Sequence, residues 1–362
     1  MARRLAELPK GTRITDHISL GVLAKTFPRE VIERILRDTE RASRRRRQLP
    51  APVVVYYVIA LALYMEVAYG EVLRCLLEGL RWLSWPSGTV PVTGKSGISQ
   101  ARTRLGVEPV KQLYEHVVHP IAKPRTKGAR YRRWRLVSID GSTLNVADTA
   151  ENAAAFGRPG ASRGQSAYPQ LRFVSLVENG THVLFGAELG AYTSGEGSLA
   201  KAVVERLEAD MLCLADRGFF SFALWSRAAA TGAALLWRVK KNQVLPCRQR
   251  LADGSYLSKV YASPKDRRHD RDGRLVRVIE YRLEAIAGTE PLYRLITTIT
   301  DPALAPAREL AALYHERWEI ETAFDELKTH LRGRRMVLRS KKPEWASRSS
   351  MASCWPTMRS AA

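Results

Sequence analysis

Short apolar runs separated by turn signals follow one another over residues 134–242, and they narrow the choice of fold more than any other stretch. The runs "RLVSID", "MLCLAD" and "ALLWRV" predict buried strands. Two alternating runs around Asn179-Gly180 predict a β-hairpin, and helical patterns separate the later strands. The succession strand, hairpin, helix, strand, helix, strand predicts a mixed α/β sheet with helical cover.

The rest of the chain divides by its patterns. Residues before this region alternate helical patterns with breakers, and the apolar run 53–65 is too short to span a bilayer and predicts a buried helix. The predicted divisions are a helical N-terminal DNA-binding domain (1–125), the first part of the core (126–242), an inserted β-subdomain (243–300), the last part of the core (301–343) and an atypical tail (344–362).

The formal net charge of +22 favours a polyanionic partner, most simply nucleic acid. A high-GC genome that favours arginine could supply part of this excess. The four cysteines lack the spacing of a zinc site or a disulfide framework. The N-terminus has no apolar signal-peptide segment. We therefore expect a cytoplasmic, nucleoid-associated protein that does not enter a membrane.

The stretch 314–331, "YHERWEIETAFDELKTHL", predicts a helix with a polar stripe. Tyr314, Arg317, Glu321 and Lys328 lie at offsets of three, seven and fourteen, so they share one side of a helix. The apolar residues gather on the neighbouring face. A carboxylate and two cations would therefore lie at the edge of a core.

Three carboxylates can converge if this helix packs beside the strand ends. Asp140 and Asp216 each end an apolar run, and Gly141 would permit a turn after the first. Each acid alone has an ordinary interpretation, as a turn residue or, for Glu321, as half of a surface ion pair. Together they would repel one another unless cations bind them, and oxygen ligands suit Mg²⁺ or Mn²⁺. Two such ions can activate a nucleophile and stabilise a leaving oxygen at a phosphodiester.

The residues "YHERWEIETAFDELK" match the pattern Y-x2-R-x3-E-x6-K, and the chain resembles the DDE transposases of bacterial insertion sequences, in the insertion element 4 group. The resemblance extends from "LPAPVVVYYVIALALYMEVAYGEVLRCL" to "VLRSKKPE". It implies a ribonuclease-H-like core in which Asp140, Asp216 and Glu321 hold two catalytic metal ions. It also implies that Tyr314, Arg317 and Lys328 contact DNA phosphates near the element end.

Other basic residues are weaker candidates for DNA contacts. The resemblance implies that Arg238 and Lys240, on one side of "WRVKKN", touch DNA, although a solvated strand face would look the same. Arg102 and Arg104 lie on a predicted basic helix that could approach DNA or could simply be exposed. Trp318 is expected to pack rather than to stack on a base.

The implied reaction is hydrolysis at each terminal inverted repeat, which frees a 3′-OH that then attacks target DNA, or the opposite strand to form a hairpin. A homodimer in a synaptic complex with double-stranded DNA is the implied assembly. The alternative is a catalytically impaired, truncated derivative that only occupies element ends. A general nuclease of the same fold agrees less well with the Tyr-Arg-Glu-Lys stripe.

The tail departs from the family pattern after "VLRSKKPE". It reads "WASRSSMASCWPTMRSAA", with Pro356 and no helical period. A back-translation shifted by two nucleotides can give "GVEKFYGFLLAHYAVRS", which resembles the missing helix. We therefore hypothesise a frameshift that removes the last packing helix, and we expect lower stability and weaker subunit pairing.

Overall fold

The structure, a computed structural model, describes residues 23, 26–45, 49–64, 67–82, 93–161, 164–165, 168–282, 292–325 and 337–353. The chain forms two compact units. Unit 1 comprises Met1–His119, Leu144–Gln170 and Asp325–Arg359; unit 2 comprises Pro120–Thr143, Leu171–Phe324 and Ser360–Ala362. This division differs from the predicted one because two segments distant in sequence join the N-terminal helices in unit 1.

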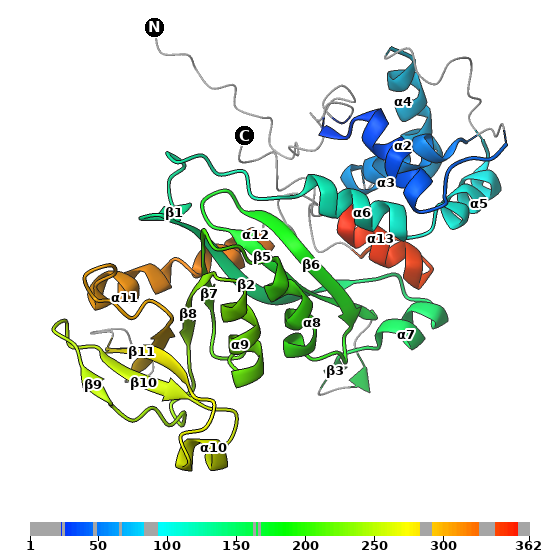
Figure 1. Cartoon of the computed structure of the whole chain (residues 1–362). Coiled ribbons are helices and arrows are strands. Elements are labelled where there is room, and N and C mark those ends of the chain that lie inside the picture. Colours follow the sequence, from blue (N-terminus) through cyan, green and yellow to red (C-terminus); the bar gives the residue numbers. More distant parts are fainter. Residues whose placement is uncertain are drawn as a thin grey trace, which may run out of the picture. The chain divides into compact units, whose positions relative to one another are not determined.

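Unit 1 is built mainly of helices, which in Figure 1 are blue and cyan near the N-terminus, green for α7 and red for α13. They are α2 (Arg29–Asp38), α3 (Ala51–Leu63), α4 (Tyr69–Trp82), α5 (Lys95–Leu105), α6 (Glu108–Val117), α7 (Ala150–Phe156) and α13 (Pro343–Ser353), with the short strands β3 (Gly160–Ala161) and β4 (Gly164–Gln165). Residues 53–62 of α3 are all buried, as expected for a helix that is apolar on every side. Across the described ranges, none of the helices has the length and apolar character needed to cross a membrane.

Helix α13 corrects the prediction that the tail lacks a helix. It packs against α3, α6 and α7 within unit 1. Ala346 and Ala352 are fully buried, and Trp345 is 9% exposed. Small residues that allow close helix packing therefore compensate for the weak periodicity, and the expected loss of a packing helix is wrong for residues 343–353.

Unit 2 is organised around one large mixed sheet with the strand order β6-β5-β2-β7-β8-β12-β11-β10-β9, and β1 pairs with β2. The strands are β1 (Arg130–Tyr131), β2 (Trp134–Asn145), β5 (Gln170–Glu178), β6 (Val183–Ala191), β7 (Met211–Ala215), β8 (Ala234–Arg238), β9 (Gln249–Arg250), β10 (Tyr256–Val260), β11 (Arg274–Tyr281) and β12 (Tyr293–Thr297). Strands β2, β7 and β8 run parallel, whereas β5 and β6 form an antiparallel hairpin. The predicted ribonuclease-H-like mixed sheet with a helical N-terminal region is confirmed.

Helices of unit 2 connect and cover these strands (Figure 1). They are α8 (Glu196–Val203), the 3-10 turn η2 (Val204–Arg206), α9 (Phe222–Ala230), α10 (Pro264–Arg268), α11 (Ala307–His315) and α12 (Trp318–Asp325). The segment 243–300 is rich in strands, as predicted, but β12 pairs with β8. These strands therefore extend the main sheet and do not form a sheet of their own.

The hairpin turn between β5 and β6 requires a glycine. Gly180 has a φ of +78°, and a Cβ there would lie 2.3 Å from the backbone oxygen of Lys127. Glycine alone adopts this conformation without a steric penalty. The Asn-Gly pair that predicted the turn therefore also lets the backbone of residues 127–129 pass in direct contact with Gly180.

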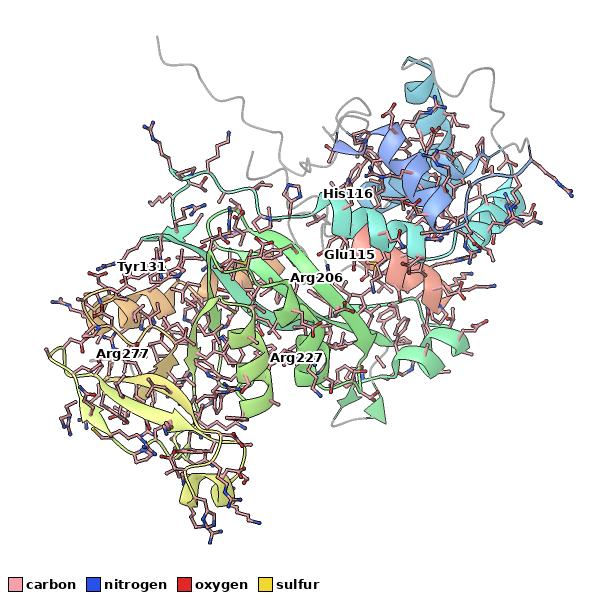
Figure 2. The ribbon with its side chains drawn as sticks, viewed as in Figure 1. Glu115, His116, Tyr131, Arg206, Arg227 and Arg277 are labelled. Carbon is pink, nitrogen blue, oxygen red and sulfur yellow. The ribbon has the colours of Figure 1, made fainter. Side chains whose placement is uncertain are left out.

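A buried arginine joins the added strands to the segment before α11. Arg277, labelled in Figure 2, is fully buried on β11 and pairs with Asp253. It also donates to Ser255 Oγ at 2.7 Å and to the backbone oxygen of Ala305 at 2.7 Å. Burial lowers the pKa of Arg277, whereas Asp253 acts in the opposite direction. The charge is thus tolerated because its hydrogen bonds are made inside the unit.

We expect Arg277→Met to lower the free energy of unfolding by about 3–5 kcal/mol, because it leaves the Asp253 carboxylate without its ion pair and two acceptors without the guanidinium. The matched control is Arg274→Met on the exposed end of the same strand, which should change stability by about 0.5 kcal/mol or less. Urea unfolding measures both. Equal unfolding midpoints for the two variants would contradict this account of Arg277.

Candidate active site

Asp140 and Asp216 lie beside one another on neighbouring parallel strands. In the β2–β7 register Ile139 is opposite Ala215, so the next residues are Asp140, within β2, and Asp216, directly after the end of β7. Asp140 Oδ1 accepts from its neighbour's backbone N–H, that of Gly141, at 2.7 Å. Adjacent strands are about 4.8 Å apart. The structure therefore brings these two predicted residues together within unit 2.

The predicted turn after Asp140 is wrong, because β2 continues to Asn145. Gly141 instead lies close to a side chain of another element: a Cβ there would lie 2.9 Å from the side chain of Glu196, the first residue of α8, which would have to shift. Glu196 pairs with Arg172 at 3.6 Å and raises the pKa of Asp140. A fourth carboxylate therefore lies near the two aspartates, and no motif in the sequence indicated it.

The predicted single helix over 314–331 is also corrected. Helix α11 ends at His315 and α12 begins at Trp318, so Arg317 lies in the turn between them. The backbone N–H of Arg317 donates to the oxygen of Tyr314 at 3.2 Å, a bond three residues back. Such bonds tighten the chain to a 3-10 turn. The turn keeps Tyr314 and Arg317 on one side, and Glu321 follows one turn later.

Arg317 joins two of the three predicted metal ligands. Its Nη1 lies 3.5 Å from Asp140 Oδ2, and its Nη2 lies 3.3 Å from Glu321 Oε1. The Arg317 side chain is 11% exposed, and Asp216 is among the charges that raise its pKa. Asp140 and Glu321 therefore converge on one guanidinium. Asp216 is close enough for its charge to act on the same guanidinium.

Tyr314 supports this arginine from inside the unit. It is 6% exposed within the apolar core, and burial raises the pKa of its phenol to about 12. A hydrogen bond with Arg317 acts in the opposite direction. Most of the tyrosine side chain therefore lies in the core beside Arg317, and its predicted contact with a DNA phosphate stays a prediction.

A buried hydrogen-bond chain links β2 to the turn before α12. Ser138, two residues before Asp140, donates to Asn179 Oδ1 at 2.9 Å. Asn179 Nδ2 donates to the backbone oxygen of Glu316 at 3.3 Å. The next backbone N–H, that of Gly180, donates to Glu319 at 2.6 Å. The hairpin turn therefore fixes α12 against the strand that carries Asp140, a role that the Asn-Gly turn signal did not reveal.

Three further residues of unit 2 were singled out in the sequence, namely Arg238, Lys240 and Trp318. The Arg238 guanidinium lies 4.2 Å from the ring centre of Tyr293, and its charge reaches Tyr314. Lys240 is exposed just after β8. Trp318 is 59% exposed beside Arg317, so the expectation that it packs in the core is wrong.

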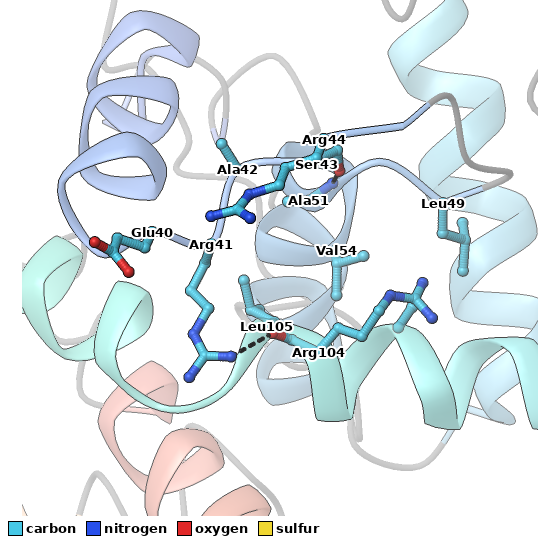
Figure 3. A pocket seen from close by; sticks show the side chains of 11 residues that line it. Glu40, Arg41, Ala42, Ser43, Arg44, Leu49, Ala51, Val54, Arg104 and Leu105 are labelled. Carbon is cyan, nitrogen blue, oxygen red and sulfur yellow. Dashed lines mark hydrogen bonds between the residues drawn. The ribbon is translucent and has the colours of Figure 1, made fainter.

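The remaining basic candidates have different surroundings. Lys328 lies outside the described residues. Arg102 is 3% exposed inside unit 1, so the prediction that it contacts DNA is corrected: its guanidinium packs in the interior. Arg104 is exposed and borders a cavity of about 240 Å³ together with Arg41 and Arg44 (Figure 3).

Burial changes the protonation of Asp140. It raises the pKa of this carboxyl to about 6, and Asp216 and Glu196 act in the same direction. The Gly141 N–H and Arg317 act against this rise. The folded protein therefore holds the proton on Asp140 more tightly than the unfolded chain does. The contribution of this group to the free energy of unfolding is present below about pH 4 and is lost as the pH rises from about 4 through about 6.

We expect Asp140→Asn to stabilise the protein at pH 7.5 in EDTA by on the order of 2–3 kcal/mol, because it removes the buried charge. The two proteins should converge as the pH falls below about 3, where the aspartate is protonated in both the folded and the unfolded state. Thermal unfolding across this pH range, with the exposed Glu208→Gln as control, measures the effect. A variant that is no more stable than the parent at pH 7.5 would contradict it.

The donor set suits a hard divalent cation. Asp140, Asp216 and Glu321 supply carboxylate oxygens only, the ligands preferred by Mg²⁺ and Mn²⁺. Within the ranges that the structure describes, no three acidic, histidine or cysteine side chains are already grouped at ligating distances. Two of these acids instead face Arg317, which supplies positive charge at the same place. In donor chemistry the three carboxylates fit divalent ions, and in this structure Arg317 lies between two of them.

Two known families match this chain. Residues 133–347 match the family described as "Transposase DDE domain", and residues 17–115 match "Insertion element 4 transposase N-terminal". The first match covers more than half of the chain, which therefore belongs to the DDE-domain transposases. Within that class, the N-terminal part of the chain is similar to the insertion element 4 transposases.

Individual known proteins are also similar to this chain. The chain is 29% identical over 317 residues to "Transposase InsG for insertion sequence element IS4" of Escherichia coli (strain K12), covering 87% of this chain and 70% of that protein. It is 26% identical over 204 residues to "Putative transposase InsZ" of the same strain, covering 56% and 65%. A cryo-EM structure of the piggyBac transposase synaptic complex with hairpin DNA is also similar, with 14% identity, 96% and 75% coverage and a TM-score of 0.46.

Proposed function

We propose that this transposase cuts phosphodiester bonds at the terminal inverted repeats of its own element and joins the freed 3′-OH ends to target DNA. Asp140, Asp216 and Glu321 would hold two Mg²⁺ or Mn²⁺ ions. The observation that carries the proposal is the convergence of Asp140 and Glu321 on one guanidinium, beside the strand end that bears Asp216. Bound divalent ions would supply activation of the nucleophile and stabilisation of the leaving oxygen.

The chain's own residues have separate tasks in this proposal. Arg317 exchanges its carboxylate partners for a DNA phosphate, which suits a guanidinium because it can contact two oxygens at once. Tyr314 orients that guanidinium from the core. Trp318, exposed next to it, offers a ring on which a base can stack.

Affinity for DNA comes from the basic surface. Arg238, Lys240 and Arg104 contact the phosphate backbone in this proposal, together with Lys328, and the net charge of +22 supports it. Binding should therefore weaken steeply with salt. An element has two ends to cut and join, so two copies of the chain in one synaptic complex are part of the proposal.

A combined cleavage and joining assay tests the function. The full chain is incubated with a duplex that carries the element's terminal repeat, beside a precut duplex with a free 3′-OH and a target plasmid. We expect cleavage and joining with Mg²⁺ or Mn²⁺, and neither with EDTA. Retained DNA binding with neither product under any metal condition would overturn the proposal and favour a protein that only occupies element ends.

A further inference from the structure

Two arginines lie in the interior of unit 1, where α5 meets α13. Arg102 is 3% exposed and Arg348 is fully buried. Arg348 Nη1 donates to the backbone oxygens of Arg102, at 2.6 Å, and of Gly106, at 3.0 Å. These bonds join the C-terminal helix to the end of α5, but carbonyl oxygens do not neutralise either positive charge.

The hydrogen-bonding capacity of these arginines is incompletely used. Arg102 Nε, Arg348 Nε and Arg348 Nη2 are buried without a hydrogen-bond partner. Among the described residues, no carboxylate forms an ion pair with either side chain. Burial lowers the pKa of Arg348 to about 9, the charge of Arg102 acts in the same direction, and Glu344 alone opposes it. A buried charge normally requires a paired charge and satisfied donors.

A small cavity beside Arg102 is lined with hydrogen-bond donors. Its volume is about 20 Å³, and its polar lining is Tyr69, Arg102, Arg339, Ser340 and Ser349. Arg102 Nη2 donates to Ser340 Oγ at 3.4 Å, and that hydroxyl lies 3.0 Å from Ser349 Oγ. The volume suits one water molecule or one small ion. Two guanidinium groups and one serine hydroxyl can donate to an anion there, while the other hydroxyl donates in the Ser340–Ser349 contact.

Aromatic rings hold the arginines but bring no negative charge. The Arg102 guanidinium lies 4.5 Å from the Trp345 ring centre and 5.4 Å from that of Tyr69. Arg339 lies 4.8 Å from the same tyrosine ring and donates to the backbone oxygen of Val67 at 2.9 Å. These contacts fix the geometry of the cluster, and the excess of positive charge persists.

We propose that this cavity binds a small monovalent inorganic anion, of which chloride is the representative. The anion pairs with Arg102 and Arg339, accepts from Ser340, and reduces the repulsion that Arg348 experiences. It thereby stabilises the attachment of α13 to α5. The site does not include the carboxylates in unit 2. A negative result for this anion site would therefore leave the proposed function untouched, and the reverse also holds.

Thermal unfolding of the full chain tests the site, with chloride compared with gluconate and with phosphate at equal ionic strength. Gluconate and phosphate are both too large for the cavity. We expect a saturable rise of about 3 °C in the unfolding temperature with chloride at ten times its dissociation constant. Ser340→Ala, which keeps every charge, should weaken chloride binding and so raise the half-saturating chloride concentration about tenfold.

Arg102→Met and the matched control Arg104→Met, two residues along the same helix and exposed, complete the test. The first should remove the chloride dependence, and the second should keep it. ³⁵Cl line broadening by the parent protein and by Ser340→Ala gives a direct measure of binding if Arg102→Met does not fold. Equal stabilisation by all three anions, or chloride dependence unchanged in Ser340→Ala, would overturn the proposal.

Discussion

Replacing Glu321 by glutamine should reduce the rate of cleavage at the terminal repeat by at least about 10³-fold while leaving DNA affinity nearly unchanged. Glutamine keeps the size of the side chain on α12 but loses the charge that faces Arg317 at 3.3 Å. In the proposed function that carboxylate is a metal ligand, and an amide is a poor substitute. Rates of single-turnover cleavage and equilibrium binding to the same duplex measure the two quantities separately.

Glu208→Gln is the control for this substitution, because Glu208 is exposed in the same unit and has no part in the proposed site. It should cleave at the parent rate. A Glu321→Gln protein that cleaves within about threefold of the parent would show that the carboxylate is not required, whatever its DNA affinity.

Asn179→Ala should lower the cleavage rate about 10²-fold without a matching change in DNA affinity. The side chain connects Ser138 of β2 to the backbone of Glu316 before α12, so its loss frees the helix that carries Glu321 to shift relative to Asp140. A displacement of about 1 Å at reacting groups can cost this much in rate. The measurement is the cleavage rate at saturating DNA, compared with the dissociation constant for the same DNA.

Lost stability must be separated from lost positioning in this experiment. Ser175→Ala removes a buried hydroxyl from β5 that donates to the backbone oxygen of Phe185 at 3.0 Å, and it has no link to α12. It should lower the unfolding temperature to a similar extent and leave the cleavage rate intact. Equal loss of rate in the two variants would mean that Asn179 acts only through stability.

Much of the fold could be predicted from the periodicity of apolar residues and from turn residues. Apolar runs identified the parallel strands β2, β7 and β8, and an Asn-Gly pair located the β5–β6 hairpin. The sequence did not show that β12 pairs with β8, because strand partners distant along the chain leave no local pattern. It also failed at α13, where close packing of small residues replaced an amphipathic period.

The candidate site was predictable where residues act from one local element. The strand-end aspartates and the Tyr-Arg-Glu stripe are visible in the sequence, and the structure gathers them in unit 2. Glu196 and Asn179 were not identified, because their importance depends on a close approach at Gly141 and on a backbone oxygen of another element. Burial was misjudged in both directions, with Arg102 inside and Trp318 outside, since three-dimensional packing decides which side of a helix is covered.

The proposed function depends most directly on whether the three carboxylates form one metal site. Mn²⁺ binding to the full chain, in the presence of a precut terminal-repeat duplex, can be followed by titration calorimetry and electron paramagnetic resonance. We predict two bound Mn²⁺ ions in the parent, and loss of at least one in each of Asp140→Asn, Asp216→Asn and Glu321→Gln. Mn²⁺ binding with the same stoichiometry and affinity in all three variants would contradict the account.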